Sequence, residues 1–151
     1  MMTQITSLIF IIIGWIVVHF LARHRDLERD WRSFAIETVK NINIIEDDAI
    51  RYHTSDTRNK DSEQKIRQSL SELDTRINAL KKFFRFNEDI SFFRAAITLD
   101  NFASSGFKKQ DYPSAILNDI SYHAGLLREC LYNIPNRSYL QFLQDLRNSK
   151  R

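Results

Sequence analysis

The chain has 151 residues, of which 43% are hydrophobic and 27% are charged, and its formal net charge is +3 at pH 7. One cysteine, three glycines and two prolines exclude an intramolecular disulfide, a structural zinc site built from cysteines and a glycine-rich phosphate-binding loop. Because acidic and basic side chains nearly balance, no basic face is expected and nucleic acid is not predicted as a partner.

The N-terminal segment, residues 1–22, is predicted to be a transmembrane anchor. It contains an unbroken apolar run at residues 8–18 and no Lys or Arg. A helix over residues 5–22 would be about 27 Å long, close to the ~30 Å hydrocarbon core of a bilayer. A cleavable signal peptide is disfavoured, because the segment lacks a positive N-terminal region and a small-residue cleavage site. The residues taken to mark the span are Ile5, Leu8, Ile12, Trp15, Val18 and Ala22.

Basic residues flank this segment only on its C-terminal side, at Arg23, Arg25, Arg29 and Arg32. Loops rich in Lys and Arg remain on the cytoplasmic side of a membrane. The sequence therefore predicts a single-pass membrane location, with the N-terminus outside and residues 23–151 in the cytoplasm.

The remaining chain is predicted to form an all-α bundle of four or five helices. Its first helix has apolar residues at spacings of three and four, which is the pattern of one inward-facing stripe. No helix breaker separates this stripe from the anchor, so one continuous helix is expected. A polar loop should follow at 52–62, with Asp61 capping the next helix. The stripe consists of Trp31, Ala35, Thr38, Ile42, Ile45, Ala49 and Tyr52.

The second helix has the most regular pattern in the chain, with apolar residues alternating at spacings of four and three. Such a seam suits packing against the first helix in a long antiparallel hairpin, or packing between subunits. The hairpin is favoured because a short connection usually places neighbouring helices side by side. The predicted seam comprises Ile66, Leu70, Leu73, Ile77, Leu80 and Phe84.

A third helix is expected to start near Asn87 and to end at 104–106, where Gly106 would adopt a left-handed conformation. After a loop at 104–112, a fourth helix should open near Pro113. A short last helix is expected before a frayed basic tail at 147–151.

Basic and aromatic residues alternate where the second and third helices meet. Such a pattern can contact an anionic membrane surface or a partner, or stack on single-stranded nucleic acid, although aromatic rings at this position are more simply explained as bundle core. The candidate contact residues are Lys81, Lys82, Arg85, Phe86 and Arg94.

No catalytic, cofactor or metal-binding motif is recognised, and no cofactor is expected. His53 falls in the predicted polar loop, and His123 lacks a His or Glu three or four residues away that could complete a zinc pair. An enzyme would need a site assembled from scattered groups such as Asp119, His123 and Arg128.

The function predicted from these patterns is a non-enzymatic, membrane-tethered helical module for interaction or scaffolding. Its expected partners are the lipid bilayer and either a second copy of the chain or a membrane-associated protein. One alternative is an effector of the toxin or phage-exclusion type, which would oligomerise and perturb the bilayer. A second alternative is an enzyme with an unrecognised site.

Overall fold

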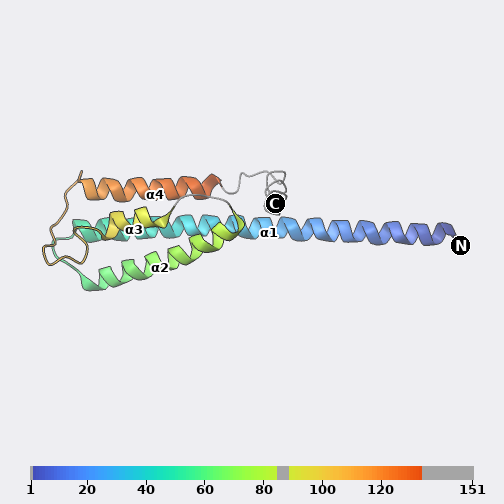
Figure 1. Ribbon diagram of the computed structural model, residues 1–151, viewed down its shortest axis with the longest axis horizontal. Coiled ribbons are helices and arrows are strands. Elements are labelled where there is room, and N and C mark those ends of the chain that lie inside the picture. Colours follow the sequence, from blue (N-terminus) through green and yellow to red (C-terminus); the bar gives the residue numbers. More distant parts are fainter. Residues whose placement is uncertain (1, 85–88, 134–151) are drawn as a thin grey trace, which may run out of the picture. The chain divides into compact units, whose positions relative to one another are not determined.

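The computed structural model describes the backbone of residues 2–84 and 89–133, and within these the side chains of all residues except 2–9, 24, 28 and 83. The described residues form four helices and no strand: α1 (Met2–Thr54), α2 (Lys60–Phe83), α3 (Ile90–Thr98) and α4 (Ala115–Asn133) (Figure 1). The prediction of an all-α helical bundle is confirmed for this part of the chain.

The predicted membrane span is not supported. Among the described residues, no helix is both long enough and apolar enough to cross a bilayer. This finding overturns the predicted single-pass location with a cytoplasmic body. The side chains of Ile5 and Leu8, also assigned to the span, lie outside the described residues.

The predicted continuity of the first helix is confirmed, since α1 runs without a break from Met2 to Thr54. Contacts within the chain nevertheless divide it into two units, Met1–Phe34 and Ala35–Arg151. We refer to them as unit 1 and unit 2 and describe each by itself.

Unit 1 is the N-terminal part of α1, and it contains two local ring contacts. The ring of Trp15 stacks on that of His19 with centroids 5.4 Å apart, and Trp31 meets Phe34 edge-on at 5.8 Å. These contacts join residues three or four positions apart, which are neighbours on the surface of one helix. They do not enclose a core.

Unit 2 has a core to which all four helices contribute. The predicted stripe on α1 is buried from Ala35 onward, whereas Trp31 is half-buried. On α2 the first five seam residues are buried, and Phe84 caps the C-terminal end of the helix in a half-buried position. The seam residues with at most 2% exposure are Ile66, Leu70, Leu73, Ile77 and Leu80.

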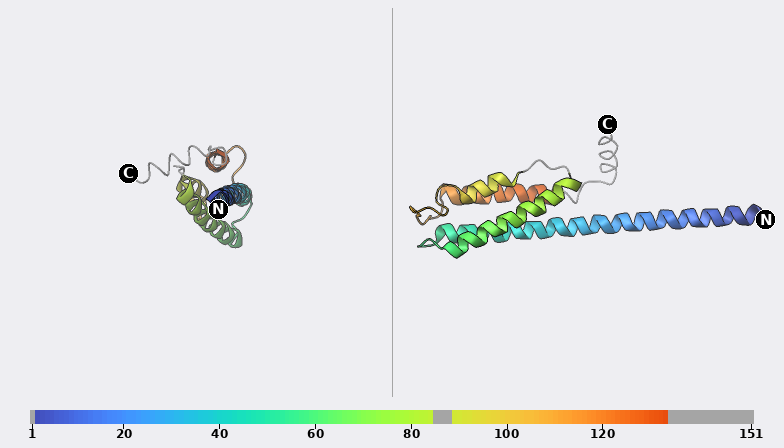
Figure 2. Two further views of the ribbon diagram at one scale, coloured as in Figure 1. Left: turned by 90° about the vertical axis from the view of Figure 1, so that its right-hand side faces the viewer. Right: turned by 60° about the horizontal axis from the view of Figure 1, so that its bottom comes forward.

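Ion pairs show the relative direction of α2 and the unit 2 part of α1. Lys65 Nζ lies 2.8 Å from Asp48 Oδ2, and Arg76 NH1 lies 3.3 Å from Glu37 Oε2. The residue number of the α1 partner decreases as the residue number on α2 increases, so α2 and the unit 2 part of α1 are antiparallel (Figure 2).

The connection between α1 and α2 is shorter than predicted. It comprises residues 55–59, because α1 continues through Thr54 and α2 begins at Lys60. The N-cap of α2 is Asn59 and not Asp61: the Oδ1 atom of Asn59 accepts hydrogen bonds from the backbone N–H groups of Asp61 (2.9 Å) and Ser62 (3.1 Å). Those bonds satisfy two of the donors that a helix start leaves unpaired.

The third helix is also shorter than predicted, since α3 begins at Ile90 and ends at Thr98. The expected termination at Gly106 is wrong, because Gly106 does not have a positive φ. Left-handed backbone occurs instead at Asp100 (φ 57°) and Ala103 (φ 55°). The chain leaves the helix early because side chains far away in the sequence bind this segment, as described below.

The fourth helix starts at Ala115, close to the predicted Pro113, and it lies alongside α3 (Figure 1). The guanidinium of Arg128 joins α4 to α1, donating hydrogen bonds to Asn43 Oδ1 (3.0 Å) and to Glu46. The predicted last helix and the tail at 147–151 lie outside the described residues. The buried side chains of α4 are Leu117, Ile120, Ala124, Leu127 and Leu131.

Candidate functional site

A buried polar cluster lies where α1 ends. His53, predicted to sit in a polar loop, belongs to the last turn of α1 and is 0% exposed. Its Nε2 atom is 3.0 Å from the carbonyl oxygen of Ile97, and its Nδ1 atom is 3.2 Å from Nδ2 of Asn101. A carbonyl oxygen can only accept, so Nε2 carries the proton and Nδ1 accepts from the Asn101 amide. The ring is therefore held as one neutral tautomer.

Asn101 also organises the loop that follows α3. Its Nδ2 atom donates to the carbonyl oxygen of Lys108 (2.8 Å), and its Oδ1 atom accepts from the backbone N–H of Lys108 (2.8 Å). The backbone N–H of Gln110 donates to the carbonyl oxygen of His53 (2.8 Å). Together these bonds fasten the loop to the end of α1.

Tyr52 and Glu63 form the second half of the cluster. The Tyr52 hydroxyl donates to Glu63 Oε1 (2.8 Å) and accepts from the backbone N–H of Ala103 (3.2 Å). Arg58 binds the same carboxylate through both oxygens, at 2.5 Å from Nε and 3.0 Å from NH2. The Tyr52 ring also lies 5.1 Å, centroid to centroid, from the ring of Phe102.

The pKa shifts of these groups follow from their surroundings. Burial lowers the pKa of His53 below its usual value of 6.5, and the hydrogen bond to Ile97 opposes this only in part. Hydrogen bonds from Arg58 lower the pKa of the Glu63 carboxyl. Burial raises the pKa of the Tyr52 hydroxyl. Each polar group here has a protein partner, and these contacts hold together the end of α1, the start of α2 and the loop after α3.

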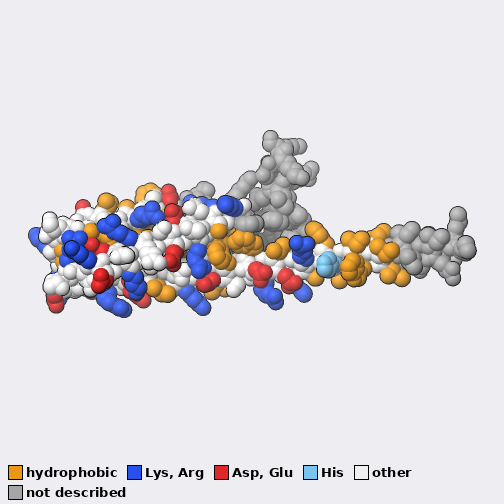
Figure 3. All heavy atoms as spheres, turned by 90° about the horizontal axis from the view of Figure 1, so that it is seen from below, with side chains coloured by type: hydrophobic (Ala, Val, Ile, Leu, Met, Phe, Trp, Pro, Cys, Tyr) orange, Lys and Arg blue, Asp and Glu red, His pale blue; other side chains and the backbone are white. Residues whose placement is uncertain are grey.

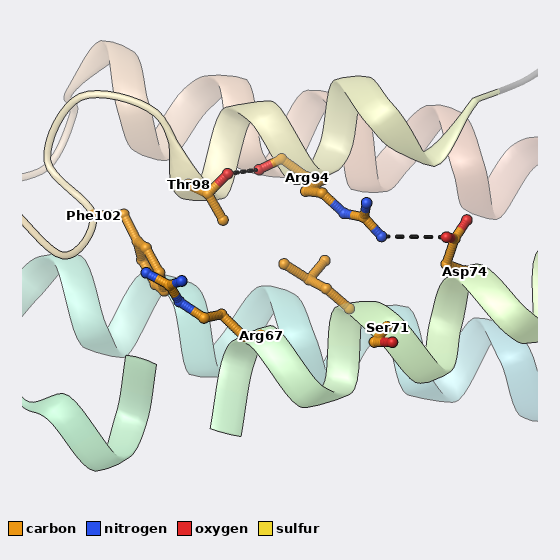
Figure 4. A pocket seen from close by; sticks show the side chains of 7 residues that line it. Arg67, Ser71, Asp74, Arg94, Thr98 and Phe102 are labelled. Carbon is orange, nitrogen blue, oxygen red and sulfur yellow. Dashed lines mark hydrogen bonds and ion pairs between the residues drawn. The ribbon is translucent and has the colours of Figure 1, made fainter. Parts of the chain in front are cut away.

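A groove lies between α2 and α3 in the same unit, with a volume of about 570 Å³ (Figure 4). Arg67 reaches over the ring of Phe102, 5.5 Å from its centroid, and Arg94 pairs with Asp74 at 3.4 Å. The buried side chain of Leu70 lines its apolar part. The polar and aromatic lining residues are Arg67, Ser71, Asp74, Arg94, Thr98 and Phe102.

Of the candidate contact residues between the second and third helices, the structure describes Lys81, Lys82 and Arg94, and both Lys81 and Arg94 attract the carboxylate of Asp89. Lys81 and Lys82 are exposed on the last turn of α2, while Arg94 belongs to the groove. Arg85 and Phe86 lie outside the described residues, so the predicted contact at these positions stays a prediction.

The scattered groups considered for an enzyme do not form a common pocket. Arg128 is bound to Asn43 and Glu46 of α1, and the ring of His123 stacks on that of Phe92 with centroids 5.8 Å apart. Asp119 is exposed. In the part of the chain that the structure describes, no group of three or more His, Cys, Asp or Glu side chains could hold a metal ion.

Unit 1 presents an extended apolar surface. Its ten large hydrophobic residues between Phe10 and Leu21 are 48–74% exposed, and they include Ile12, Trp15 and Val18 of the predicted span. Figure 3 shows apolar side chains gathered along this part of α1.

A regular stripe runs through this surface and continues past it. Its positions are four and three residues apart from 13 to 34, and only position 24, a histidine, is not apolar. Leu27 continues the stripe into the charged stretch and is 51% exposed. This is the spacing of a coiled-coil seam. The apolar members are Ile13, Val17, Phe20, Leu27, Trp31 and Phe34.

Comparison with known proteins gives no match for the chain, whether among protein-family models, curated proteins or solved structures.

Proposed function

We propose that the protein is a non-enzymatic helical interaction module that associates with further copies of itself through the stripe on unit 1. The observation that supports this is the exposed apolar surface between Phe10 and Leu21. A helix that is apolar on all sides is normally buried, and the contacts within unit 1 leave these side chains uncovered.

The stripe offers exposed apolar side chains for an interface. Its members Ile13, Val17, Phe20 and Leu27 are each at least half exposed. Burial of each such side chain contributes about 1.5–3 kcal/mol, so self-association has an adequate driving force.

A second copy in parallel orientation suits this surface best. The apolar segment is followed directly by a charged stretch that begins at Arg23 and contains Asp26 and Arg29. A parallel copy brings apolar segment against apolar segment and charged stretch against charged stretch. An antiparallel copy would place charged side chains against Ile13 and Phe20, which costs desolvation without compensation.

The stripe specifies which face of unit 1 is buried in this assembly. Positions four and three residues apart lie along one side of a supercoiled helix. Leu27 supports this assignment, because it lies beyond the continuous apolar segment and its exposed side chain contributes no burial energy in a single copy. Packing against Leu27 of a second copy accounts for an apolar residue at this point.

Sedimentation velocity of the full chain without detergent tests the proposal. We expect the wild-type protein to sediment as an oligomer and Leu27→Asp to shift it toward monomer, because an acidic side chain would be buried in the seam. Ser33→Asp is the matched control: it adds the same charge to an exposed position of unit 1 that is not on the stripe, and it should leave the oligomer intact.

Two results would overturn the proposal. One is a wild-type protein that remains monomeric at all concentrations, and the other is an equal effect of Leu27→Asp and Ser33→Asp. If a chain that never associates with itself instead floats with lipid vesicles, lipid and not a second copy covers the apolar surface.

A further inference from the structure

The groove between α2 and α3 combines uncompensated positive charge with an apolar wall. We propose that it binds a small organic monoanion, a carboxylate on a planar apolar body, with Arg67 as the main binding residue. A volume of about 570 Å³ is within the range of small-molecule sites. The site is independent of the apolar stripe on unit 1.

The charge on Arg67 is not neutralised by contact. Glu63, one turn earlier on the same helix, attracts Arg67, but Arg58 and Tyr52 already bind that carboxylate. Within the described residues no carboxylate forms an ion pair with Arg67, whose contact is with the face of the Phe102 ring. Arg58, Glu63 and Arg67 therefore leave one positive charge at this end of the groove.

The other end of the groove is neutral. Arg94 of α3 pairs with Asp74 of α2 at 3.4 Å, and both side chains remain partly exposed. Partly exposed pairs of this kind are weak. Figure 4 shows Arg94 directed toward Asp74, at a distance from Arg67 and Phe102. The site as a whole thus carries one net charge, which suits a monoanion.

The residues beside Arg67 indicate that the rest of the ligand is planar and apolar. The planar guanidinium rests over Phe102, and the buried side chain of Leu70 lines the same groove. A guanidinium can stack on a planar group while its N–H edge binds a carboxylate through two hydrogen bonds. An aromatic carboxylate meets both requirements, while a phosphate ester carries up to two charges and so exceeds the single net positive charge of the site.

Titration of the full-length protein with benzoate, followed by amide NMR and calorimetry, tests the proposal. Benzamide is the uncharged ligand of the same shape. We expect benzoate to bind and benzamide to bind at least about tenfold more weakly, and we expect Arg67→Gln to weaken benzoate binding by about tenfold or more. Lys60→Gln removes an exposed charge from the same helix and should leave the affinity unchanged.

A substitution at the neutral end should act in the opposite direction. Asp74→Asn releases Arg94 from its ion pair, so the affinity for benzoate should increase several-fold. Phenyl phosphate should bind the wild-type protein more weakly than benzoate does, and its affinity should increase most in Asp74→Asn. The proposal is overturned if benzoate and benzamide behave alike, if Arg67→Gln and Lys60→Gln have equal effects, or if Asp74→Asn weakens benzoate binding.

Discussion

The side-chain amide of Asn101 donates a hydrogen bond to Nδ1 of His53 across 3.2 Å, although the two residues are 48 positions apart in the chain. The same amide is bonded to both backbone groups of Lys108. One side chain on a loop thus determines the tautomer of a buried histidine and the path of the chain after α3.

Asn101→Ala should lower the free energy of unfolding by about 2–4 kcal/mol, because it removes three hydrogen bonds and leaves buried polar groups without partners. Urea denaturation followed by circular dichroism measures this. Asn78→Ala is the control, because Asn78 is exposed on α2 and its loss should change stability by less than about 0.5 kcal/mol. Equal effects of the two substitutions would show that the buried amide is not important for stability.

Stability should decrease as the pH falls below about 6.5, the usual pKa of histidine. Burial lowers the pKa of His53 in the folded state, so over this range the unfolded chain takes up a proton that the folded chain does not. The loss continues as the pH falls until the folded state is protonated as well.

Unfolding free energies measured between pH 7.5 and pH 5 in the wild type, His53→Gln and His123→Gln test this dependence. His53→Gln should be less stable at neutral pH but should lose most of the pH dependence. His123→Gln should retain it, since this substitution leaves His53 and its partners unchanged. An unchanged slope in His53→Gln would contradict the assignment.

Leu73→Ala should destabilise unit 2 by about 2–5 kcal/mol, because Leu73 is 0% exposed and the substitution leaves a cavity in the core. The same change at Leu99, which is 61% exposed, should cost less than about 0.5 kcal/mol. Thermal unfolding of both variants measures this difference in stability. If Leu73→Ala only dissociates an oligomer and leaves a folded monomer, the α2 seam lies between subunits.

Disulfide crosslinking tests the parallel register of the proposed self-association. In a Cys130→Ser background, Leu27→Cys should form covalent dimers, because equivalent seam positions face each other in a parallel assembly. Ser33→Cys, off the stripe, should crosslink poorly. Efficient crosslinking between Ile13→Cys and Phe34→Cys in a mixture would instead indicate antiparallel copies.

The buried faces of the helices could be predicted from the sequence because they depend on spacing alone. The series from Ile66 to Leu80 alternates at four and three residues, which places all members on one side of a helix. The same reasoning located the stripe that ends at Tyr52, and both faces are buried in unit 2. Local periodicity was therefore sufficient to predict which faces of α1 and α2 are buried in the bundle.

The end of α3 could not be predicted in this way. Gly106 is the residue that local chemistry favours for ending a helix, but the chain leaves α3 after Thr98 because Asn101 is bound by His53 and Lys108. These interactions connect residues up to 48 positions apart. A pattern read along one helix contains no information about them.

Arg94 was among the predicted contact residues, but Arg67 and the groove itself were missed for a similar reason. Arg67 and Arg94 belong to different helices and form no motif in sequence; the groove exists only because α2 and α3 pack together. His53 lies in a run of polar residues and was therefore expected to be solvated. The signal that could have identified it is its position directly after Tyr52, the last residue of the buried stripe.

The side chain of Asn101 acts as a substitute peptide group, since it donates to and accepts from Lys108 just as one strand residue pairs with another. A carboxylate of the same size could accept the Lys108 N–H but could not donate to the carbonyl or to His53. The NH2 group of this one side chain therefore carries two of the bonds that fasten the loop to the end of α1 and to itself, and replacing one nitrogen by oxygen would remove both.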